Sequence, residues 1–103
     1  MKYQLVLQFP AGSIADYDEL IAIEDLLIEE LDGRADVDGH DCGSGEMNIF
    51  IITDEAKGIF DCVKPLLAKR KNFEKLVAAY REVDGEQYTT IWPENSRKPF
   101  TVK

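Results

Sequence analysis

The chain is poor in the residue types on which much of small-protein chemistry depends. Its 103 residues include one histidine, two cysteines and one tryptophan. The cysteines, Cys42 and Cys62, form no Cys-x-x-Cys motif, which argues against a zinc knuckle and a thioredoxin-like site. We expect both to be free thiols in a reducing compartment. We also expect no metal, no cofactor and no assigned catalytic residue.

Long apolar runs are also missing. No stretch approaches the roughly 20 residues of a membrane-spanning helix. The opening "MKYQLVLQFP" is too short and too interrupted by glutamine for a signal peptide. We therefore expect a cytoplasmic protein that makes no membrane contact. The length and the 45% hydrophobic content predict one folded domain. We place this domain, of α+β class by the order of elements given below, at residues 1–93, followed by a polar tail over 94–103.

Positive charge is scarce in the first half of the chain. Residues 15–46 hold twelve Asp or Glu and one Lys or Arg, whereas residues 57–103 hold ten Lys or Arg and six Asp or Glu. The net charge of −8 repels phosphate backbones, so nucleic-acid binding is not expected. The acidic half favours basic protein partners or contacts between copies, and it also serves solubility.

Hydrophobic periodicity predicts seven elements. Residues 2–9 alternate as a strand, and a helix should run from Ser13, as N-cap, to about Leu31. Strands at 35–42 and 46–53 flank the turn "GSG", and Asp54 should cap a second helix that Pro65 kinks or ends. Asp84-Gly85 predicts a hairpin between strands near 77–83 and 86–92. The first helix should bury one stripe: Tyr17, Leu20, Ile21, Ile23, Leu27, Ile28 and Leu31.

The first six elements follow the order β-α-β-β-α-β. This order resembles the ferredoxin-like arrangement, with an additional C-terminal strand. The resemblance implies an antiparallel sheet with two helices on one face, and it carries no family motif from which a function follows. The free face would expose some apolar side chains, and a homodimer through that face would cover them. The alternative is a monomer whose last hairpin curls over the same face.

One charged residue interrupts the first helix's apolar stripe. Glu24 falls between Leu20 and Ile28 on the helical wheel. A carboxylate there is expected to pair with a cation or to reach water at the helix edge. The functional alternative is a general acid or base with a raised pKa.

The stretch "VDGHDCGSGEM" holds the sharpest cluster of polar side chains. Alternation would place Asp36, Asp38 and His40 on the free sheet face, where they could bind a metal or a small molecule. A bulge at Gly39 would break that alternation, and an acidic edge strand that resists aggregation explains the same residues. Cys42 lies near His40, but the neighbouring carboxylates disfavour a thiolate nucleophile.

Two functions remain open at this stage. The first is a non-enzymatic interaction or regulatory domain that docks a basic protein, as small acidic immunity-type inhibitors do. The second is a metal- or small-molecule-binding domain, or a minor enzyme, with its site around Asp36, Asp38 and His40. We expect a non-enzymatic interaction domain rather than an enzyme. The candidate binding residues are Glu24, Asp36, Asp38, His40 and Trp92.

Overall fold

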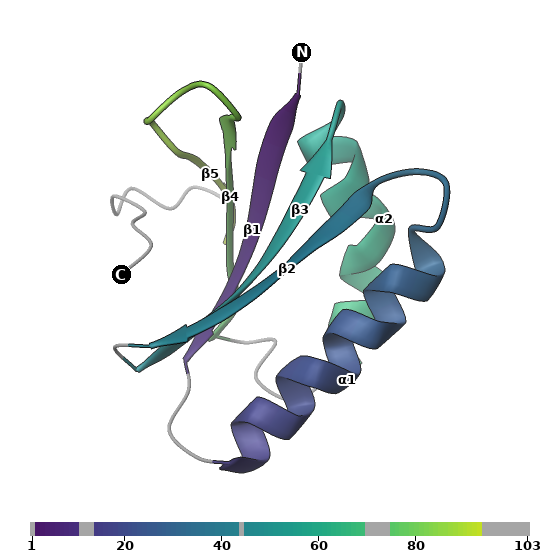
Figure 1. Cartoon of the computed structure of the whole chain (residues 1–103), viewed down its shortest axis with the longest axis vertical. Helices are drawn as coiled ribbons and strands as arrows, with labels where there is room; N and C mark the ends of the chain where they lie inside the picture. Colours follow the sequence, from purple (N-terminus) through teal and green to yellow (C-terminus); the bar gives the residue numbers. More distant parts are fainter. Residues whose placement is uncertain (1, 11–13, 44, 70–74, 94–103) are drawn as a thin grey trace.

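The computed structural model describes residues 2–10, 14–43, 45–69 and 75–93. Within these residues the chain forms an α+β structure with two helices and five strands (Figure 1). The elements are β1 (Tyr3–Pro10), α1 (Ile14–Glu30), β2 (Asp36–Gly43), β3 (Glu46–Thr53), α2 (Ala56–Leu67), β4 (Val77–Glu82) and β5 (Thr89–Trp92). The predicted order of elements is therefore confirmed. Ser13 and the 94–103 tail lie outside the described residues.

All the strands belong to one antiparallel sheet with the order β2-β3-β1-β4-β5. β1 is central because it pairs with β3 on one side and β4 on the other, so that Leu5 faces Ile51 and Tyr80 across the two ladders. The connection through α1 leads from β1 past β3 to β2, and that through α2 leads from β3 past β1 to β4. β2 and β5 are consequently the two edge strands.

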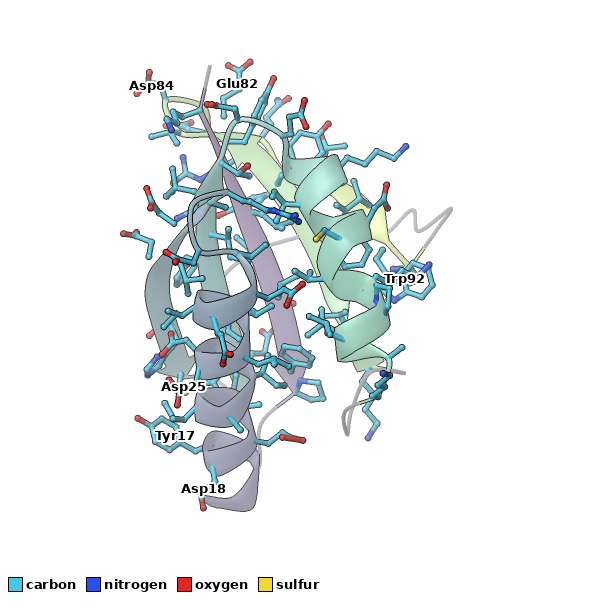
Figure 2. The ribbon with its side chains drawn as sticks, turned by 90° about the vertical axis from the view of Figure 1, so that its right-hand side faces the viewer. Tyr17, Asp18, Asp25, Glu82, Asp84 and Trp92 are labelled. Carbon is cyan, nitrogen blue, oxygen red and sulfur yellow. The ribbon has the colours of Figure 1, made fainter. Side chains whose placement is uncertain are left out.

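Both helices pack on the same face of this sheet, as expected (Figures 1 and 2). Alternation along β1 turns Leu5, Leu7 and Phe9 toward the helices, where all three are buried. Each such side chain contributes about 1.5–3 kcal/mol when fully buried. The helices supply the other wall of this core: Leu20, Ile23, Leu27, Leu31, Ala56, Ile59, Phe60, Val63 and Leu67.

The face of the sheet away from the helices carries the alternate residues of each strand, which point in the opposite direction from the core residues. Val6 pairs with Phe50 and Ala79 across the two ladders, and both Val6 and Ala79 are fully buried. Phe50 and Ile52 are only partly buried on this face. The apolar exposure on this face therefore lies toward β3 rather than at its centre.

One predicted helix boundary needs correction. α2 begins at Ala56 with Glu55 as its N-cap residue, so Asp54 does not cap it; Thr53 Oγ1 instead accepts the Glu55 amide hydrogen at 3.1 Å. Pro65 lies in the last turn of α2, which ends at Leu67.

The predicted hairpin forms, but its second strand begins only at Thr89. The turn before it is organised by Arg81, whose Nη1 donates to the carbonyl oxygens of Val83 and Gly85 at 2.8 Å each. The chain after β4 therefore turns around the Arg81 side chain, and the pairing of β4 with β5 does not extend into this turn.

Candidate functional site

Exposed carboxylates are concentrated on α1 and on β2, the edge strand that α1 contacts. Figure 2 shows Asp18 and Asp25 on the outer side of α1. α1 packs against β2, so the two elements bring their acidic residues to the same edge of the molecule, with Asp36 and Asp41 on the sheet face away from α1. Arg34 is the one Lys or Arg among positions 17–43, and His40 is the one histidine. We call the following exposed residues the acidic surface: Asp18, Asp25, Glu29, Glu30, Asp32, Asp36, Asp38 and Asp41.

The same side of α1 carries two large apolar side chains that sequence reasoning assigned to the core. Tyr17 is 45% exposed and Ile28 is 50% exposed. The predicted stripe was too wide, because the sheet contacts only the face centred on Leu20 and Leu27. At about 100° per residue, Tyr17 and Ile28 fall on the flank of that face. A narrower apolar arc would have identified both as exposed.

Glu24 lies on this flank and meets His40 of β2. Glu24 Oε2 is 2.9 Å from His40 Nδ1, and the two side chains are 14% and 27% exposed. The Tyr17 ring stands edge-on to the imidazole, with centroids 5.9 Å apart and planes at 72°. The carboxylate is thus partnered, as expected, but by the imidazole rather than by Lys or Arg.

A bulge in β2 brings His40 to the helices. The register with β3 shifts between Val37 and Gly39, which leaves Asp38 as the extra residue. Gly39 has a φ of 132°, a conformation that side-chain-bearing residues rarely adopt. His40 then pairs with Ile49, a core residue on the helix side of the sheet.

The predicted shared face of Asp36, Asp38 and His40 is therefore wrong. Asp36 pairs with Ile52 on the face away from the helices, whereas His40 points to the helix side. The bulge that the sequence allowed at Gly39 is the physical reason. Among the described residues, no three His, Cys, Asp or Glu side chains are arranged to hold a metal ion.

Cys42 has an exposed side chain whose surroundings do not activate the thiol. Desolvation and the negative charge of Asp41 both raise the pKa of Cys42. A raised pKa reduces the thiolate fraction at neutral pH, which opposes nucleophilic catalysis.

Trp92, the remaining candidate, lies far from this region, in the strand at the opposite edge of the sheet. Its ring packs on Phe60 with centroids 6.2 Å apart, and Lys64 Nζ lies 3.9 Å from the ring centroid. The structure therefore places it in the packing between α2 and β5, apart from Glu24 and His40.

Sequence reasoning did not anticipate a contact between Arg34 and Cys62. The Arg34 guanidinium donates to Cys62 Sγ at 3.3 Å, and the two residues border a hollow of about 500 Å³ beside the start of α2. They are 28 positions apart, so no local motif indicates the contact.

Comparisons with protein families, with curated protein sequences and with solved structures find no match to this chain. Over the part of the chain that the structure describes, neither helix has the length and apolar character needed to cross a membrane.

Proposed function

We propose that this protein is a non-enzymatic interaction domain whose acidic surface docks a basic protein partner. The observation that carries the proposal is that eight exposed carboxylates come from neighbouring elements at one edge of the molecule, namely α1, the turn after it and the edge strand β2. Such a field accelerates encounter with a basic partner and selects against acidic ones. If the partner's basic surface is its own active site, docking would inhibit it, as immunity-type proteins do.

The proposal includes a ferredoxin-like arrangement with β5 as an additional edge strand. The order β2-β3-β1-β4 within the sheet and the helices on one face support it. The arrangement matters for function because it leaves β2 as an edge strand beside α1.

A homodimer through the face away from the helices is a separate part of the proposal. The partly exposed side chains of Phe50 and Ile52 support it, since a second copy would cover them. Sedimentation equilibrium of the protein and of Ile52→Lys tests it. A monomer at all concentrations would remove the dimer and leave the docking surface untouched.

Two charge variants with equal net charge test the docking proposal. The first variant carries Asp25→Asn, Glu29→Gln and Asp36→Asn. The second carries Glu82→Gln, Asp84→Asn and Glu86→Gln, three exposed residues between the end of β4 and the start of β5. Figure 2 labels Glu82 and Asp84 of this second set. Binding of each variant and of the native protein to a panel of basic proteins is measured at about 20 mM and about 200 mM salt. Charges are screened over roughly 20 Å at the lower concentration and roughly 7 Å at the higher one.

The expected result is salt-sensitive binding that falls at least about tenfold in the first variant and changes little in the second. Equal losses in both variants would indicate a response to net charge alone. That outcome, or the absence of any salt-sensitive partner, would overturn the proposal.

The second candidate is a small-molecule or metal site near the Glu24–His40 pair. The 2.9 Å approach of a carboxylate and an imidazole favours it, since this pairing recurs in proton-transfer and metal sites. Because His40 and Asp36 point to opposite faces, such a site would use Glu24 and His40 without Asp36. A thermal-shift screen of divalent ions and metabolites tests it, with His40→Ala as the negative control.

A further inference from the structure

The exposed flank of α1 has the spacing of a helix-binding surface. Tyr17, Ile21 and Ile28 lie at positions i, i+4 and i+11 of one helix, so they form a line about 16 Å long. We call these three residues the apolar ridge. Ile21 is partly buried and supports the two half-exposed ends.

Negative charge borders the apolar ridge on the outer side of α1. On the outer side of α1 lie Asp18, Asp25 and Glu29, which follow the ridge around the helical wheel. On the other side lies β2, whose His40 contacts both Tyr17 and Glu24. Among the exposed carboxylates of β2, Asp36 and Asp41 belong to the opposite face of the sheet, and Asp38 is the residue extruded at the bulge. The main acidic border of the apolar ridge is therefore the outer side of α1.

The edge of β2 is a poor template for strand addition. Its ladder is interrupted between Val37 and Gly39, where Asp38 is extruded. Bulges and charged side chains on an edge strand discourage a further strand from pairing there. An extended basic peptide therefore fits this side of the molecule less well than a helix lying along α1.

We propose that the apolar ridge is the centre of the docking surface and that its occupant is a basic amphipathic α-helix of a protein partner. Apolar side chains of the partner, spaced i, i+4 and i+7 or i+11, would pack on Tyr17 and Ile28. Lys or Arg beside its apolar stripe would face the carboxylates on the outer side of α1. This inference rests on the proposed function and adds the partner's form and its anchor residues. Aromatic and aliphatic side chains at the centre of a charged rim are the usual energetic anchors of an interface.

Two synthetic peptides of about five helical turns test the inference. One carries leucine along a single stripe with lysine on both borders, and the other has the same composition reordered so that leucine surrounds the helix. Affinities are measured by isothermal titration calorimetry against the native protein, the Tyr17→Ser/Ile28→Ser variant and Val83→Ser. Val83 is 41% exposed near the β4–β5 turn and is the matched control for losing an exposed apolar side chain.

The native protein is expected to bind the amphipathic peptide at least about tenfold more tightly than its isomer. Tyr17→Ser/Ile28→Ser should abolish that preference, while Val83→Ser keeps it; circular dichroism confirms that both variants fold. Equal, salt-sensitive binding of both peptides, unaffected by Tyr17→Ser/Ile28→Ser, would overturn the inference and leave the charge-based function standing.

Absence of binding by either peptide would also overturn the inference, and the charge-variant comparison then decides the proposed function by itself. Self-association that disappears in Tyr17→Ser/Ile28→Ser, without peptide binding, would identify a second copy of the chain as the occupant. That result would also contradict a basic helix as the partner.

Discussion

Glu24 of α1 and His40 of β2 lie 16 positions apart in the sequence, and Glu24 Oε2 is 2.9 Å from His40 Nδ1 in the structure. This contact joins α1 to the edge strand beneath the apolar ridge. It depends on two local irregularities: a carboxylate within an apolar helix face and a bulge at Gly39.

Removing either partner of the Glu24–His40 pair should destabilise the fold. We expect Glu24→Ala and His40→Ala to reduce the free energy of unfolding by about 1–2 kcal/mol each, because each leaves a partly buried polar group without its partner. The double variant should lose less than the sum, with a coupling of roughly 0.5–1.5 kcal/mol. Urea denaturation of the native protein, the two single variants and the double variant measures this coupling free energy. Strict additivity would show that the contact contributes nothing to stability.

Gly39→Ala should destabilise through the backbone alone. An added Cβ would meet no atom within 4 Å, but the φ of 132° is unfavourable for alanine, and we expect a loss of about 1–3 kcal/mol. Gly58→Ala in α2 is the control, where the added Cβ would lie 3.3 Å from the end of the flexible Glu55 side chain. Because alanine favours the helix, Gly58→Ala should stabilise by roughly 0.5–1 kcal/mol. Changes of the same sign at both positions would contradict the bulge conformation.

Cys42 should react slowly with alkylating reagents. Its pKa is raised by desolvation and by Asp41, so at mildly alkaline pH a smaller fraction is thiolate than in a free cysteine. In a Cys62→Ser background, the pH–rate profile for iodoacetamide should be displaced to higher pH. Asp41→Asn should move it part of the way back, because the desolvation remains, whereas Asp84→Asn, at a distant turn, should not. A profile at or below that of a free thiol would contradict this environment.

Trp92 should report the docking of β5 on α2. It is the only tryptophan, so intrinsic fluorescence during urea denaturation follows this packing directly. We expect Phe60→Ala to destabilise by about 3–5 kcal/mol, since it empties a buried aromatic position. Lys64→Ala should reduce stability by about 0.5–1 kcal/mol through the lost cation–π contact, and Lys57→Ala, exposed on the same helix, should stay within about 0.5 kcal/mol. Equal effects of the two lysines would contradict the Lys64–Trp92 contact.

Most secondary structure was predictable because it depends on local signals. Alternation in "KYQLVLQF" indicated β1, and the glycine turn between residues 42 and 46 indicated β2 and β3. All three strands lie within one residue of their expected bounds. The prediction for the first helix went too far at Tyr17 and Ile28. The width of a buried helix face depends on how much of the helix the sheet contacts, and that is a tertiary quantity.

The candidate site was predictable only in its parts. Glu24 and His40 were both singled out, but alternation placed His40 on the wrong side of the sheet. A bulge adds one residue to a strand and reverses the side of every residue after it. Gly39 permits such a bulge without requiring it, so only the pairing with β3 decides its position.

The sequence by itself determined the α+β class, the order of the elements and the concentration of negative charge in residues 15–46, because periodicity, turn residues and composition act locally. Tertiary structure decided which side of α1 stays exposed, which face His40 occupies and that Glu24 meets it. These depend on strand register and on helix–sheet contact, which arise between residues that are distant along the chain.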